Sequence, residues 1–202
     1  MSSAVPVMAV MVAAAVGAGS AAAGSLRGWE QPSENPAAYV IGVDDAVHHE
    51  GGSSAFIRCM PCTAEAPATL MQVVRADKYR GGRLRLRGSM KSADVGRWAG
   101  FWMRVDGRVV RSLAFDNMSS RSVRGNTPWS RYEVVLDVPE EAVQIAFGFL
   151  LTGEGEVWAD DLSLGAVGRD VPSTDLGYGP EYVTEEVTSS APAEPQNMSF
   201  EK

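Results

Sequence analysis

The stretch from Arg97 to Leu164 constrains the fold more than any other part of the chain. It consists of short runs in which apolar and polar residues alternate, separated by Gly, Pro, Asn and Asp. A period of two residues is typical of β-strands that bury one face, whereas an amphipathic helix repeats about every 3.6 residues. Several such strands joined by short turns predict an all-β protein, an antiparallel β-sandwich or barrel.

The pattern extends upstream, and strands are expected at nine places in all. These are residues 38–43, 54–59, 70–76, 83–90, 98–105, 109–115, 132–138, 143–150 and 156–164. Asp106-Gly107 lies between two alternating runs and predicts a hairpin turn. No segment has a convincing helical period, so the fold class predicted is an antiparallel β-sandwich without helical layers.

Alternation also assigns the two faces of each strand. Between residues 98 and 105, one side of the strand carries only apolar residues, and the other carries Trp98, Trp102 and Arg104. The apolar side is expected to face the core. The core candidates of this and two further strands are Leu84, Leu86, Ala99, Phe101, Met103, Val105, Tyr132, Val134, Leu136 and Val138.

The first 26 residues carry no charged side chain. Residues 4–16 are apolar, and Ala21-Ala22-Ala23 offers the small residues found at signal-peptidase sites. Residues 1–26 therefore predict a signal peptide and an exported protein, periplasmic or secreted. The alternative is an uncleaved anchor formed by residues 4–23, which are about long enough to span a membrane.

The rest of the chain divides by composition. Residues 27–171 contain all the expected strands and predict one domain. Residues 172–196 are polar and rich in Glu, Pro, Ser and Thr, and predict a linker. Residues 197–202 become apolar again and are a candidate strand that returns to the domain.

The two cysteines form a Cys59-Met-Pro-Cys62 motif. A thioredoxin-like site would need a βαβ unit, which the chain lacks, and a zinc site would need His48 and His49 as further ligands. A local disulfide or two free thiols at a strand end is favoured over both.

Charge is distributed unevenly. Residues 78–131 carry 13 Lys or Arg and 3 Asp or Glu, whereas residues 132–202 carry 2 and 15. No helix-turn-helix, zinc-finger or basic-helix pattern accompanies the basic region, so nucleic acid is not an expected partner. Internal neutralisation is expected, with a further affinity for acidic glycans or lipid head groups left open.

Several motifs resemble those of a known group of proteins. They are Gly28-Trp29, Tyr39-x-x-Gly-x-Asp44, Gln72-Val-Val-x-Ala76 with Tyr79-x-Gly-Gly-x-Leu-x-Leu, and Val157-Trp-Ala-Asp-Asp-Leu-Ser-Leu164. Over residues 28–167 the chain resembles the galactose-binding-like β-jelly rolls, in particular the calcium-bearing carbohydrate-binding modules of bacterial glycanases. Segments 98–104 and 115–118 are also similar to a set of uncharacterised bacterial proteins, some labelled as transcriptional regulators.

The resemblance implies a circular permutation and a calcium site. In the modules an Asn-x-x-Phe-Glu segment precedes Gly-Trp, whereas the similar segment here is Asn197-Met-Ser-Phe-Glu201 at the other end. If it returns, Phe200 should be buried and Glu201 should lie near Asp160. Asp160 and Glu201 are then the expected ligands of a structural Ca²⁺. For the C-terminal segment the alternatives are a truncated fragment of a second repeat and a free tail. For the acidic residues the alternative is a strand end that faces water.

Six residues are candidates for ligand binding. Trp98, Trp102 and Arg104 could form a sugar platform, because aromatic faces stack on pyranose C–H groups and charged groups bind hydroxyls. The polar segment after residue 115 adds Asp116, Asn117 and Arg121. The alternatives are a second small core around the tryptophans, and a loop whose Asp and Asn cap their own backbone.

The resulting functional hypothesis is an exported, non-catalytic protein that binds a carbohydrate or another polar small ligand. No catalytic residues are predicted, because no nucleophile motif is present. The alternative is a ligand-sensing or protein-interaction domain of the bacterial envelope or of a regulator. A hydrolase ranks third, with Asp116 and either Glu133 or Asp137 as its carboxylates. A membrane partner is expected only if the N-terminal segment stays uncleaved.

Overall fold

The computed structural model describes residues 26–32, 37–59, 66–179, 181–183, 187 and 189–201. The predicted signal peptide or anchor lies outside the described residues except for Leu26, and so does Cys62. Cys59 is disulfide-bonded, which removes it as a thiolate ligand for zinc. Within the described ranges no helix is long and apolar enough to cross a membrane.

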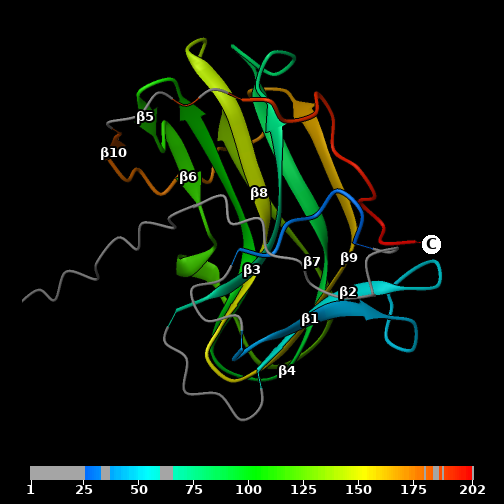
Figure 1. Ribbon diagram of the computed structural model, residues 1–202. Coiled ribbons are helices and arrows are strands. Elements are labelled where there is room, and N and C mark those ends of the chain that lie inside the picture. The colour runs from blue at the N-terminus through cyan, green and yellow to red at the C-terminus, as the bar shows by residue number, and fades with distance from the viewer. Residues whose placement is uncertain are drawn as a thin grey trace, which may run out of the picture.

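The fold is all-β and antiparallel, as predicted (Figure 1). The described residues form ten strands and one short 3₁₀ turn. The strands are β1 (Val40–Asp44), β2 (Ser54–Cys59), β3 (Ala68–Arg75), β4 (Arg83–Gly107), β5 (Val110–Arg111), β6 (Ala114–Asp116), β7 (Val123–Asp137), β8 (Ala142–Thr152), β9 (Gly155–Val167) and β10 (Glu181–Tyr182). The 3₁₀ turn η1 spans Ser119–Arg121.

Strand β4 belongs to both layers of the sandwich. Its first half pairs with β9 on one side and β7 on the other, and β2 and β1 follow beyond β9. Its second half pairs with β8 and β6, and β3 follows beyond β8. We call β1-β2-β9-β4-β7 the first sheet and β3-β8-β4-β6 the second sheet. Together they form a curled, jelly-roll-like sheet around one core.

The two strands expected at 83–90 and 98–105 are one continuous strand. Residues 91–97 form no turn between the two expected strands. Instead the strand is bent there by three register shifts against β7, at Met90/Ser92, Ser92/Val95 and Val95/Ala99. Bulges of this kind bend a strand without ending it. The segment expected as one strand at 109–115 is divided between β5 and β6, and the turn lies after Gly107, slightly later than predicted.

The core follows the predicted alternation. All the core candidates except Tyr132 are buried in one cluster, and Tyr132 packs partly buried against it. Because β4 lines both sheets, its alternating residues contribute Leu84 and Leu86 to one wall of this core and Phe101 and Met103 to the other.

The C-terminal region is not a free linker. The described residues between 172 and 201, here called the C-terminal belt, run along the outside of the sheets in orange to red (Figure 1). Its backbone groups bond to successive strands: Thr174 to β7, Leu176 to β6, Glu181–Tyr182 to β5, Pro192 to β3 and Met198 to β9. The belt thus satisfies polar groups at strand edges that would otherwise be exposed.

The last residues return to the domain, as the resemblance implied, but not as a strand. Phe200 is fully buried, which confirms its expected position, and its ring centroid lies 5.0 Å from that of Trp29. The Trp29 indole N–H donates to the carbonyl of Asn197 at 2.9 Å. Residues 197–201 are irregular, with Asn197 and Phe200 at positive φ. The segment therefore packs the Phe200 side chain into the core and does not add a strand to a sheet.

Candidate functional site

The predicted tryptophan platform lies on the outer face of the second sheet, but one of its members is buried. Trp102 is 4 % exposed and packs with Met71 and Leu150 in a second, smaller apolar cluster. Its indole N–H donates to Thr69 Oγ1 at 2.8 Å, and Trp98 packs half-buried against the same cluster. Trp102 therefore belongs to a second small core against β3 and β8, which was the alternative to its place in an open sugar platform.

Arg104 does not point freely into solvent. Its Nε and Nη2 donate to the two carboxylate oxygens of Asp106, at 2.7 and 3.0 Å, and Asp106 is fully buried. Asp106 also accepts the side-chain amide of Gln144 at 3.1 Å and the N–H of Ser112 at 3.2 Å. A bidentate pair of this kind is charge-balanced and geometrically specific. The result is a neutral polar network on the same face as the tryptophans.

Sequence reasoning missed the partners of Arg104. Asp106 could have been found, because residues two apart on a strand share a face. Gln144 could not, because only the register of β4 on β8 places it opposite Asp106. Phe115 pairs with Arg104 across β4 and β6, and the ring of Tyr178 from the C-terminal belt lies 5.9 Å from that of Phe115.

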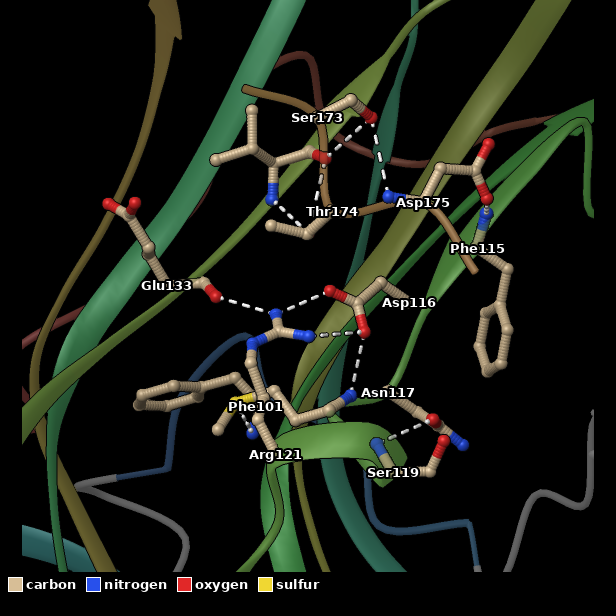
Figure 2. A network of polar contacts seen from close by, with 12 residues as sticks. Phe101, Phe115, Asp116, Asn117, Ser119, Arg121, Glu133, Ser173, Thr174 and Asp175 are labelled. Carbon is tan, nitrogen blue, oxygen red and sulfur yellow. Dashed lines mark hydrogen bonds and ion pairs between the residues drawn. The ribbon is translucent and has the colours of Figure 1, made fainter. Parts of the chain in front are cut away.

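Asp116, Asn117 and Arg121 form a self-contained structural unit (Figure 2). Arg121 donates from both terminal nitrogens to Asp116, which is fully buried and also accepts the N–H of Met118. Arg121 also donates to the carbonyl of Glu133, and Asn117 Oδ1 accepts the N–H of Ser119. These polar groups cap their own loop, so the expectation that they bind a ligand is not supported.

Alternation explains why the six sequence candidates do not form one site. Asp116 pairs with the core residue Met103, whereas Phe115 pairs with Arg104. Directly opposed residues of antiparallel strands point to the same side of the sheet. Asp116 therefore points away from the face that carries Trp98, Trp102 and Arg104.

Asp160 and Glu201, the expected calcium ligands, both hold the loop from His49 to Ser53. Asp160 Oδ2 accepts the N–H groups of His49 and Glu50 at 2.8 and 3.2 Å. Glu201 Oε1 accepts those of Gly52 and Ser53 at 2.9 and 3.3 Å. Burial raises the pKa of Asp160. The N–H bonds that its carboxylate accepts from His49, Asp161 and Glu50 oppose this shift.

This donor set does not fit calcium at Asp160 and Glu201. Calcium is surrounded by six to eight oxygens. Here both oxygens of Asp160 and the Oε1 atom of Glu201 already accept backbone N–H groups. N–H dipoles would repel the ion. In the described part of the chain, the ligand atoms that converge belong instead to His49, Glu50 and Asp161.

A cavity of ≈ 410 Å³ lies elsewhere, between the β4–β5 hairpin and the β7–β8 connection. Its charged lining residues include Arg80, Arg108 and Glu140, and its apolar ones include Val110 and Leu113. None of the six ligand-binding candidates lines this cavity. The outer face of the second sheet therefore remains the region where polar and aromatic residues of the sequence prediction meet.

Comparisons with known proteins agree on the fold. No protein-family model matches the chain. The CBM22-1–GH10 modules of a Clostridium thermocellum endo-1,4-β-D-xylanase, solved with xylohexaose, align with a TM-score of 0.52 and 10% identity, over 71% of this chain and 27% of that one. A CBM22 tandem from Paenibacillus barcinonensis aligns with a TM-score of 0.50 and 11% identity, over 75% and 43%. The fold is that of carbohydrate-binding β-sandwich modules.

One curated relative is much more similar in sequence. The uncharacterized HTH-type transcriptional regulator YbfP of Bacillus subtilis is 38% identical over 178 residues. The match covers 88% of this chain and 57% of the relative, so the chain spans a little over half the length of that protein.

Proposed function

We propose that this chain is a non-catalytic domain that binds a neutral polyhydroxylated ligand, a carbohydrate above all, on the outer face of the second sheet. The supporting observation is the Arg104–Asp106–Gln144 network on the outer face of β4 and β8. Phe115 lies directly opposite Arg104, and Trp98 lies further along the same face of β4. Aromatic faces beside paired donors and acceptors suit a sugar, which offers C–H surfaces and hydroxyl groups.

The charge balance of this face favours a neutral ligand. The Arg104 guanidinium is matched by the Asp106 carboxylate. A uronate or phosphate would have to compete with Asp106 for the same donors, and displacing Asp106 would leave a buried charge unpaired. A neutral ligand leaves this pair intact.

The length of the face suits an oligomer. Strand residues rise by roughly 3.3 Å, so Trp98 and Asp106 are about 26 Å apart along β4. Trp98 and Phe115 are half-buried and Tyr178 is exposed, so all three keep ring surface available for stacking. Trp102 packs in the same apolar cluster as Trp98 and Phe115 and so helps to hold their rings.

Affinity electrophoresis and calorimetry with neutral xylan, galactan and glucan oligomers test the proposal. Trp98→Ala should weaken binding about fivefold, since one stacked ring contributes about 1 kcal/mol, and a Phe115→Ala/Tyr178→Ala double variant should weaken it further. Trp129→Ala, on another part of the molecule, is the matched control and should bind like wild type. Binding of uronates alone, or an unchanged Trp98→Ala, would contradict the proposal.

A second candidate function is ligand sensing within a regulator. It is favoured by the similarity to an HTH-type regulator over most of this chain, because the remainder of that relative has no counterpart in the match. A sugar-dependent change in protein partners, measured by pull-down from the source cell with and without the ligand, would support it. The first candidate function includes export directed by residues 1–26. Fractionation of cells that express the chain shows whether the protein is exported and so separates the two candidates.

A further inference from the structure

The loop that follows β1 brings together ligand atoms that the proposed sugar site does not use. His49 Nδ1 lies 2.9 Å from Asp161 Oδ2, and the ligand atoms of His49, Glu50 and Asp161 all lie within 4.8 Å of one another. Ligands of one zinc-sized ion are about 3–3.5 Å apart, because each bond is roughly 2.0–2.2 Å long. Small side-chain rotations would therefore place all three around one ion.

The backbone that carries these ligands is held from both sides. The carboxylate of Asp160 fixes the N–H groups of His49 and Glu50, and Glu201 fixes the end of the same loop. Asp161 adopts a left-handed conformation with φ 52°, directly after Asp160. A site on a fixed backbone orders fewer groups when it binds, which lowers the entropic cost of binding.

A buried hydroxyl beside this loop has no partner. Ser89 lies opposite Asp160 in the β4–β9 pair, so both side chains point to the same side, toward the loop. Ser89 is fully buried, and in the described part of the chain its Oγ has no hydrogen-bond partner. Buried polar groups in folded proteins nearly always have a partner, and a bound water or ion is one that would serve here. A metal-bound water within hydrogen-bond reach of Ser89 would satisfy its hydroxyl.

We propose that His49, Glu50 and Asp161 form a site for a divalent transition metal, with Zn²⁺ as its first candidate. One imidazole nitrogen with two carboxylates suits Zn²⁺ and its neighbours, whereas calcium takes only oxygen ligands. Three protein ligands leave a coordination position open to water. Asp160 and Glu201 act as positioning residues through the loop backbone. The site is independent of the sugar-binding face.

Calorimetric titration of the full chain, after chelator treatment, with Zn²⁺ and separately with Ca²⁺ tests this site. Wild type should bind one Zn²⁺ and prefer it to Ca²⁺. His49→Ala and Asp161→Asn should each weaken Zn²⁺ binding at least about tenfold, because each removes one of three ligands. His48→Ala is the matched control, since His48 is the exposed neighbour, and it should stay within about twofold of wild type.

Trp129 provides a second, local readout. Its ring centroid lies 5.6 Å from that of His49, so a quenching ion such as Ni²⁺ at the site should lower its fluorescence. Trp129→Phe should lose this quenching while Zn²⁺ still binds by calorimetry. Equal Zn²⁺ binding by His49→Ala and wild type, no saturable binding by wild type, or a preference for Ca²⁺ would each overturn the proposal. If His49→Ala fails to fold, the exposed Glu50→Gln decides the outcome.

Discussion

The two halves of β4 carry the same alternation but end in different surroundings. The first half points Arg83, Arg85 and Arg87 away from the core, where Arg83 and Arg85 pair with partly exposed acids of β7. The second half points Trp102 and Arg104 outward, and both are nearly buried. The difference arises because β3, β8 and β6 flank the second half with apolar side chains. Alternation thus decides which side a residue faces, not whether that side meets water.

The largest effect should come from breaking the buried pair of the second half. Asp106→Ala leaves Arg104 buried without its carboxylate and should destabilise the protein by about 3–5 kcal/mol. The matched variant in the first half, Asp137→Ala, removes a 44 % exposed carboxylate, and Arg83 keeps its bond to the carbonyl of Val171, so the loss should be only about 1 kcal/mol. Urea unfolding of both variants measures the contrast. Equal losses would show that the two halves do not differ in burial.

A change in the shared core should affect both halves alike. Phe200 fills the space between the sheets, and Phe200→Ala should cost about 3 kcal/mol, the lower end for a buried Phe because the belt can relax.

Deletion of residues 196–202 should lower the melting temperature by several degrees. Calorimetry checks both variants. An unchanged melting curve for the deletion would contradict the packing of this segment against Trp29.

The smallest effect concerns pH and the exposed half. The hydrogen bond from Arg83 lowers the pKa of Asp137, with burial opposing the shift. Since the folded pKa is below the unfolded one, the stabilising contribution is present above the ordinary Asp range and is lost as pH falls through the lowered value. Urea unfolding across acidic pH should show a shallower loss for Asp137→Asn than for wild type. Identical pH profiles for the two proteins would show that the Arg83–Asp137 pair does not contribute to stability in this way.

The strand pattern predicted most of the fold because each prediction depended on local alternation. Strand β2 was predicted with its observed bounds, and the core faces of β4 and β7 were assigned correctly. The linker was predicted from composition alone, and that failed for the described part of residues 172–196. A polar, Pro-rich segment becomes ordered when its backbone can bond to the edges of strands. The sequence of the segment itself does not show that such edges are available, because they belong to distant parts of the chain.

The candidate site was predicted less well, for a related reason. The sequence identified Trp98, Trp102 and Arg104 as residues of one strand face, which the register confirms. It could not show that Asp106 and Gln144 neutralise Arg104, or that Arg121 holds Asp116. From the sequence, every polar side chain is a candidate to bind a ligand. In the folded chain, most buried polar side chains already hydrogen-bond to other groups of the protein.

The sequence by itself determined the all-β class, the sides of the strands and the charge asymmetry, because period and composition are local properties. Through its resemblance to another family's first strand, it also offered Phe200 as a core residue, with a free tail as the alternative. The tertiary structure alone decided that β4 spans both sheets, that the belt closes the strand edges, and that Asp160 and Glu201 hold one loop. Those features depend on pairing between residues far apart in the chain, where register and burial decide which groups meet.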